Sequence, residues 1–70
     1  MNQEKQILNR LTSREAEIAH LLHDGKKPAD VARALGIGSN TVRAHQNNIY
    51  KRLEIHSIQE LVLLIERAKQ

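Results

Sequence analysis

Two glycines near the middle of the chain, Gly36 and Gly38, are separated by a single residue. Glycine tolerates backbone angles that other residues resist, so it commonly stands where a helix stops or starts. The sequence on each side of the pair carries apolar residues at helical spacing, over residues 28–35 and 39–53. Two helices joined by a glycine-containing turn of about three residues are the arrangement of a helix-turn-helix.

Capping signals predict a further helix on each side of this pair. Thr12 and Glu15 have the spacing of a capping box, in which each side chain satisfies a free backbone N–H, and Ser57 and Glu60 repeat it. We also expect Glu15 to pair with a basic residue such as Arg52 inside the bundle, although capping alone would explain it. The fold class expected is all-α: a four-helix bundle that contains the helix-turn-helix, with helices at about 12–24, 28–35, 39–53 and 57–68. Residues 1–10 are expected to form a frayed or partly helical N-terminal arm, and residues 11–70 the domain.

The composition limits how such a bundle can be held together. The 70 residues contain no Cys, Phe or Trp and one Tyr, so the core has to come from aliphatic side chains. Disulfides and cysteine-based zinc sites are excluded. His20 and His23 stand three apart, a spacing that metals can use, but no third ligand lies nearby, so we expect no metal site. We also expect no cofactor, and no nucleophile, base and acid of an enzyme are visible. No apolar run is long enough to cross a bilayer and the N-terminus lacks a secretion signal, so we expect a cytoplasmic protein with no membrane partner.

The helix predicted over residues 39–53 has two different faces. Its apolar residues recur at helical spacing and should point into a core: Val42, Ile49 and Leu53. Arg43, Asn47 and Lys51 stand four residues apart and line up on another face, beside Asn40 and Ala44. The helix has no acidic residue, and the formal charge of the chain is +3. A solvated helix face usually mixes both signs, so this face is better suited to a polyanion.

The order and spacing of these residues resemble the LuxR/FixJ-type helix-turn-helix domain of bacterial transcription regulators. The family's opening Leu-Thr-x-Arg-Glu pattern is matched by Leu11, Thr12, Arg14 and Glu15. Its later pattern, Thr-Val-Lys-x-His followed by Ile and Lys-Leu, is matched by a second set of residues: Thr41, Val42, Arg43, His45, Ile49, Arg52 and Leu53. The resemblance covers about residues 11–65, and it departs from the family at Glu54, where Gly is common.

This resemblance implies sequence-specific binding of double-stranded DNA by a bacterial transcriptional regulator, with the helix over residues 39–53 in the major groove. It places Arg43, Ala44 and Asn47 where they approach bases. Arginine can donate two hydrogen bonds to guanine and asparagine can pair with adenine, so the chemistry agrees. Thr41, Tyr50 and Lys51 fall at or beside positions near the phosphates, although Tyr50 could instead cover the edge of the core. Three further residues are added as candidate phosphate contacts: Lys27, Ser39 and Asn40.

The last predicted helix is apolar beyond a single stripe, because Leu63 and Leu64 fall outside its core-facing row. A domain this small cannot bury every side of a helix, so either residues 1–10 or a second copy of the chain should cover them. In the resembled family this helix commonly forms a homodimer. We therefore expect a symmetric dimer on an inverted repeat, through Leu63, Leu64 and Arg67. An N-terminal receiver or ligand-sensing domain, common in the family, is a candidate partner that this sequence does not contain.

A protein–protein module with the same fold is the competing hypothesis. Such a module would modulate another regulator through a salt-insensitive contact at Leu63 and Leu64, without binding DNA itself. The acid-free stretch over residues 39–53 favours DNA.

Overall fold

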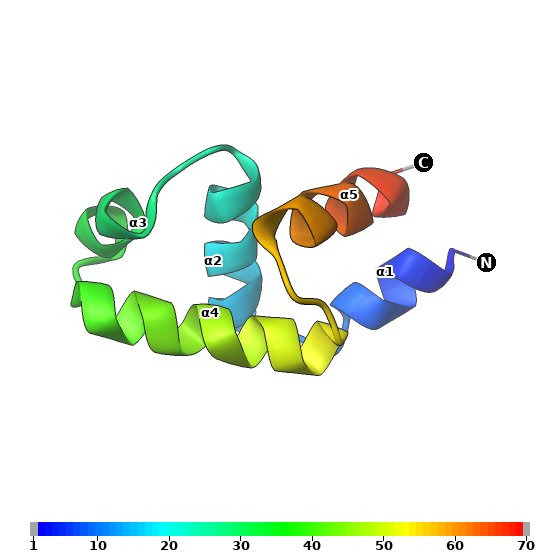
Figure 1. The fold of residues 1–70 in the computed structure, drawn as a ribbon, viewed down its shortest axis with the longest axis horizontal. Coiled ribbons are helices and arrows are strands. Elements are labelled where there is room, and N and C mark those ends of the chain that lie inside the picture. The colour runs from blue at the N-terminus through cyan, green and yellow to red at the C-terminus, as the bar shows by residue number, and fades with distance from the viewer. Residues whose placement is uncertain (1, 70) are drawn as a thin grey trace.

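A computed structural model of the protein describes residues 2–69. Met1, the first residue of the predicted arm, and Gln70, the last residue of the predicted domain, lie outside the described residues. It contains five helices: α1 Gln3–Leu8, α2 Ser13–His23, α3 Pro28–Leu35, α4 Ser39–Leu53 and α5 Ile58–Ala68. The all-α prediction is confirmed, and α1 is added to the four predicted helices. In Figure 1, α4 runs along one side of the molecule, α3 lies at one end, and α1 and α5 lie together at the other.

The segment predicted as an arm holds a helix that packs against the domain. The Asn2 side chain caps α1 by accepting a hydrogen bond from the Lys5 N–H at 3.1 Å, and it donates to the Arg67 carbonyl oxygen in α5 at 3.1 Å. Ile7 and Leu8 pack against the core. Six residues are too few for a helix to be stable by itself. The bond from Asn2 to α5 and the packing of Ile7 and Leu8 therefore hold α1 in place.

The core is aliphatic and is shared by α2, α3, α4 and α5. It holds ten buried residues: Ile18, Ala19, Leu22, Val31, Ala32, Val42, Ile49, Leu53, Leu61 and Ile65. The inward direction predicted for the apolar row of α4 is confirmed. Because α4 is held through this row, its opposite side faces away from the other helices.

The glycine-containing turn has the geometry that the sequence predicts. Gly36 ends α3 in the left-handed region with φ of 67°, and the N–H of Ile37 donates to the Ala32 carbonyl at 3.0 Å, which satisfies a free carbonyl of α3. Gly38 is extended, with φ of −74° and ψ of 151°, and precedes the first turn of α4. The turn and the packing of α3 against α4 form the predicted helix-turn-helix.

Both predicted capping pairs cap their helices, one of them in a modified form. Thr12 and Glu15 make the full box: the Thr12 hydroxyl accepts from the Glu15 N–H at 3.1 Å, and the Glu15 carboxylate accepts from the Thr12 N–H at 2.9 Å. Ser57 accepts from the Glu60 N–H at 3.2 Å, but the Glu60 carboxylate accepts from the N–H of His56 instead. Among the described residues, no helix has the length and apolar character needed to cross a membrane.

Glu15 also joins α2 to α4. Its side chain is buried, with the residue 3% exposed. The Arg52 Nε donates to the Glu15 Oε2 at 3.0 Å and lies 2.9 Å from the Oε1 as an ion pair. The predicted pairing of Glu15 with Arg52 is thus confirmed. Burial by itself raises the pKa of Glu15, but the backbone N–H of Thr12 and the Arg52 guanidinium together outweigh burial and lower the pKa below its ordinary value of 4.5.

We expect Glu15→Gln to lower the free energy of unfolding by about 1–3 kcal/mol at pH 7, because the charged hydrogen bonds to Arg52 are lost. A carboxyl group whose pKa is lower in the folded chain stabilises the fold above its unfolded pKa, near 4.5, and this stabilisation disappears as the pH falls through the lowered value. Urea denaturation at pH 7 and pH 3 should therefore show a gap between wild type and variant that shrinks on acidification.

Glu17→Gln is the matched control, because the exposed Glu17 pairs with Arg14 at 3.6 Å on the surface of α2. Such a pair is worth about 0.2–1 kcal/mol at most, so the control should denature almost like wild type. A gap for Glu15→Gln that stays constant between the two pH values would refute the assigned role of its charge.

Candidate nucleic-acid interface

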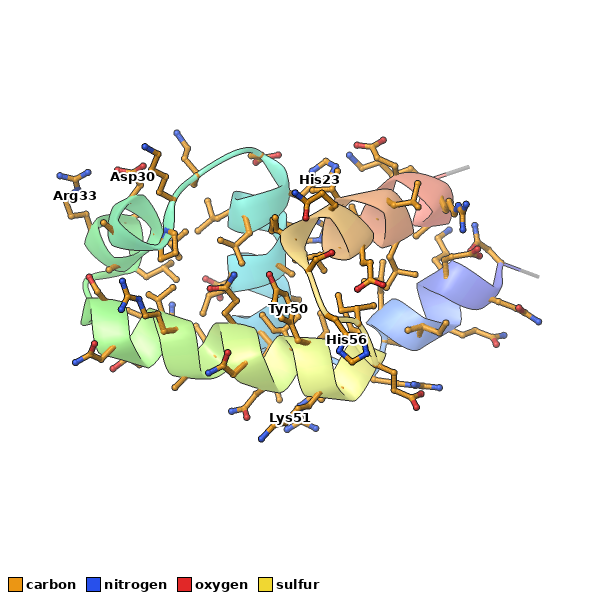
Figure 2. All side chains as sticks on the ribbon, in the orientation of Figure 1. His23, Asp30, Arg33, Tyr50, Lys51 and His56 are labelled. Carbon is orange, nitrogen blue, oxygen red and sulfur yellow. The ribbon has the colours of Figure 1, made fainter. Side chains whose placement is uncertain are left out.

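The side of α4 opposite its apolar row forms a continuous polar surface. We call it the outer face of α4, and it consists of seven exposed residues: Asn40, Thr41, Arg43, Ala44, Asn47, Asn48 and Lys51. Figure 2 shows Lys51 projecting from α4 away from the rest of the molecule. Fifteen residues of α4 give about four helical turns, so the face is long enough to follow a groove of duplex DNA.

The structure brings most of the predicted site residues together on this face. The three predicted base contacts, Arg43, Ala44 and Asn47, occupy neighbouring exposed positions. Three predicted phosphate contacts share the face with them: Asn40, Thr41 and Lys51. Ser39 is exposed at the first position of α4, beside the same face.

Tyr50 does not lie on the outer face. It is half-buried and packs against the core, and its hydroxyl accepts a hydrogen bond from the Gln46 side chain at 2.9 Å. In Figure 2 its ring points from α4 toward the interior, whereas the neighbouring Lys51 points outward. The interpretation of Tyr50 as cover for the edge of the core therefore agrees with the structure, and its phosphate contact stays a prediction.

Lys27 also stands apart from the outer face. It is exposed on the connection between α2 and α3, which in Figure 1 runs along the edge of the molecule opposite α4. Its backbone N–H donates to the Asp30 carboxylate at 3.4 Å, just before α3 begins. Lys27 can reach a phosphate only if the duplex extends past the outer face, and this contact likewise stays a prediction.

Asn48 is the outer-face residue that sequence reasoning missed. The prediction followed the row of Arg43, Asn47 and Lys51, which are four residues apart. Asn48 lies four residues after Ala44 and is equally exposed. Extending the second row from Ala44 by one helical turn would have found it.

The outer face carries positive charge that no acidic group cancels. Arg43 and Lys51 form no ion pair within residues 2–69, and the sequence contains no Asp or Glu between Asp30 and Glu54. These two flanking acids are themselves paired. Glu54 contacts Arg10 at 3.3 Å, and Asp30 pairs with a basic residue of its own helix, Arg33.

The pairing of Asp30 also affects its protonation. The hydrogen bond from Arg33 and then that from the Lys27 backbone lower the pKa of Asp30 below its usual range, so it stays ionised and neutralised by its partner. In Figure 2, Asp30 and Arg33 lie on the side of α3 away from α4. Asp30 is the last acidic residue before α4, and because Arg33 neutralises it, it would not repel an anion bound at the outer face.

Comparison with known proteins connects this geometry to a family. Residues 9–65 match the family described as bacterial regulatory proteins, luxR family. The chain belongs to this family. The match covers α2 to α4 completely and most of α5, and the resemblance noted in the sequence is confirmed.

Several curated proteins share this part of the luxR-family chain. It is 44% identical over 54 residues to the uncharacterized response regulatory protein YgeK of Escherichia coli, and this match covers 77% of this chain and 37% of YgeK. It is 34% identical over 59 residues to the response regulator protein TmoT of Ectopseudomonas mendocina, covering 84% and 27%. It is 43% identical over 47 residues to the transcriptional regulatory protein DesR of Bacillus subtilis, covering 67% and 24%. No solved structure gives a significant match.

The family and the names of these relatives identify a helix-turn-helix DNA-binding domain of transcription regulators. The chain spans only 24% to 37% of the length of these relatives. The family is one of regulators and not of enzymes.

Proposed function

We propose that this luxR-family domain binds double-stranded DNA sequence-specifically, with the outer face of α4 in the major groove. The observation that carries the proposal is the outer face itself: two unpaired cations, exposed amides and one small residue, with no acid among them. A major groove admits an α-helix and presents a different donor and acceptor pattern for each base pair. Arg43 would donate to guanine, Asn47 would pair with adenine, and Ala44 would allow close approach or touch a thymine methyl.

Phosphate contacts would flank these base contacts. Ser39, Asn40 and Thr41 lie at the start of α4, where backbone N–H groups and short polar side chains suit a phosphate oxygen. Lys51 lies three turns further along the same helix. Lys27 and Tyr50 would complete the set only if the backbone of the duplex passes close to them.

We further propose that two copies of the domain associate through α5. Leu63 is the exposed large hydrophobic residue of the described chain, with 51% of its surface accessible. Hollows lie on both sides of it, one lined by Ile58 and Val62 and the other by Ile55 and Leu64. Because Leu64 is half-buried against its own core, Leu63 would make the main contact, with the exposed Arg67 beside it.

A twofold axis through α5 would present two recognition helices to the duplex. Such a dimer reads an inverted repeat whose half-site spacing follows from the separation of the two helices. Selecting binding sites for the chain from random duplex DNA tests this proposal directly. The expected result is an inverted repeat with a fixed spacing, whereas a single unrepeated motif would refute the symmetric dimer.

We expect Leu63→Glu to abolish cooperative binding to the two half-sites while leaving the affinity for one half-site unchanged. The substitution places a charge at the centre of an apolar contact, and at this exposed position it should change the stability of the fold little. Electrophoretic mobility shifts on duplexes with one and with two half-sites measure both quantities. Gln3→Glu, which adds the same charge to the exposed surface of α1, is the control. Unchanged cooperativity in Leu63→Glu would place the dimer contact elsewhere.

The relatives suggest what could control such a domain. YgeK and TmoT are named response regulators, and the chain covers only part of each. We propose a receiver or ligand-sensing domain as the regulatory partner of this domain in a longer protein. Salt-insensitive binding of another protein at Leu63, with no DNA binding at low salt, would instead support the protein–protein module.

A further inference from the structure

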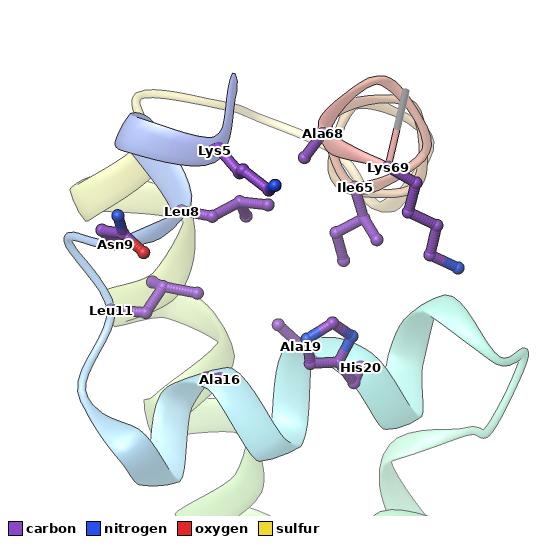
Figure 3. A pocket seen from close by; sticks show the side chains of 10 residues that line it. All are labelled: Lys5, Leu8, Asn9, Leu11, Ala16, Ala19, His20, Ile65, Ala68 and Lys69. Carbon is purple, nitrogen blue, oxygen red and sulfur yellow. The ribbon is translucent and has the colours of Figure 1, made fainter. Parts of the chain in front are cut away.

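A groove opens where α1, α2 and α5 meet, and its volume is about 420 Å³. Small-molecule pockets typically measure roughly 300–1,000 Å³, so this space is large enough for a ligand. The space exists because three alanines stand at the meeting point of the helices: Ala16 and Ala19 on α2 and Ala68 on α5. Their short side chains leave a gap over α2, and Figure 3 shows Lys5 and Leu8 of α1 on one side of this gap and Ile65 and Ala68 of α5 on the other.

The floor of the groove is apolar. Besides the alanines it is formed by Leu8, Leu11 and Ile65, so a hydrocarbon chain lying there would exchange water for carbon contacts on three sides. Leu8 and Leu11 are only half-buried in the chain as it stands, and a ligand would complete their burial.

The rim of the groove is basic. Figure 3 shows Lys5 reaching from α1 across the opening toward α5, while His20 rises from α2 into the same gap. Lys69 at the end of α5 completes the rim, and no Asp or Glu lines the groove. Lys5 forms no ion pair with any described residue, and the Lys69 Nζ lies 4.0 Å from its partner Glu66, at the limit of an ion pair. An apolar floor beneath one unpaired lysine, Lys5, and a second lysine at the limit of its ion pair is complementary to an amphipathic anion.

The groove is separate from the outer face of α4, and part of its lining lies outside the residues that match the luxR family. None of its residues belongs to α4. Four of them, Lys5, Leu8, Ala68 and Lys69, also lie outside the residues 9–65 that match the luxR family. The family match therefore does not account for α1, for the end of α5 or for the basic rim that these two segments supply.

We propose that this groove is a binding site for an amphipathic carboxylate. Its alkyl chain lies over Leu8, Leu11 and Ile65, and its carboxylate lies at the rim between Lys5 and Lys69. Such a ligand would hold α1 against α2 and α5, and it would stabilise the folded chain in proportion to its occupancy.

Titration of the ¹⁵N-labelled 70-residue chain with octanoate, below the concentration at which it forms micelles, tests the proposal. The expected result is a saturable shift of the backbone amide signals of Leu8, Ala19 and Ile65, with the outer face of α4 unaffected. Acetate, which lacks the chain, should not bind. Octanol, which lacks the charge, should bind more weakly than octanoate.

Three variants separate the parts of the site. Lys5→Gln should weaken octanoate binding about two- to fivefold, as expected for an exposed ion pair, and leave octanol unchanged. Lys51→Gln removes the same charge from α4 and should change neither. Ala16→Leu, at a half-buried position, should fill the groove and reduce both. Octanoate shifts that do not saturate, that centre on Leu63 instead, or that are equal in Lys5→Gln and wild type would overturn the proposal.

Discussion

Replacing Arg43 with Ala should weaken binding to the selected DNA site by about 1–3 kcal/mol, which is roughly 5- to 150-fold in Kd. The side chain is exposed and has no acidic partner within the described chain, so it is available for the two hydrogen bonds that a guanine edge accepts. Because one base would no longer be read, the variant should also tolerate any base pair at a single position of the site. Fluorescence anisotropy with the selected duplex and its single-position variants measures both effects.

Arg33→Ala is the control for the loss of an arginine from the helix-turn-helix. Arg33 pairs with Asp30 on α3 and points away from α4, so its removal should change Kd little. If Arg43→Ala binds the selected site as tightly as wild type, the outer face of α4 is not the reading face.

Replacing Ile49 with Ala should lower the free energy of unfolding by about 2–5 kcal/mol. Ile49 is 0% exposed at the centre of the apolar row that fixes α4 to the core, and truncation leaves a cavity that the aliphatic neighbours cannot close completely. A small domain has roughly 5 kcal/mol or little more to lose, so much of the variant should be unfolded in moderate urea. Urea denaturation followed by circular dichroism measures the loss.

Asn48→Ala is the matched control one residue away. Asn48 is exposed on the outer face of α4, so the change in unfolding free energy should stay within about 0.5 kcal/mol. Equal destabilisation by the two substitutions would mean that α4 is rotated relative to the core, and the proposed reading face would then be wrong.

The parts of the fold that the sequence predicts well are those with local signals. Pro28 marks the start of α3, Gly36 its end and Gly38 the start of α4. The structure has these two helices at the predicted bounds. The pairing of Glu15 with Arg52 was also predictable, because an acid on a core-facing row needs a basic partner.

Other features depend on contacts between distant residues, which no local pattern reveals. Helix α1 is stabilised by the bonds from Asn2 to the end of α5, more than sixty positions away. Glu54 adopts a left-handed φ of 56°, where the family commonly has Gly, and Arg10 contacts its side chain from the segment before α2. Periodicity also treated Leu63 and Leu64 alike, whereas the structure packs Leu64 against the core and leaves Leu63 exposed.

The candidate site shows the same division. Helical periodicity placed Arg43, Ala44 and Asn47 on one exposed face, and the structure agrees. Periodicity did not place Tyr50, since its position on the helix lies at the edge between core and solvent. The direction of its ring is set by packing and by its hydrogen bond with Gln46.

The most direct test of the central claim is the salt dependence of DNA binding by this chain. Anisotropy of a labelled duplex of about 20 base pairs at roughly 50 and 200 mM salt should show affinity falling at least about tenfold, the loss expected for two phosphate contacts. Lys51→Gln should reduce the slope of log affinity against log salt by about 1, whereas Lys5→Gln, which removes the same charge from the groove at α1, should leave it unchanged. Absence of binding at the lower salt, or equal slopes for Lys51→Gln and wild type, would contradict the assignment of the outer face of α4 to DNA.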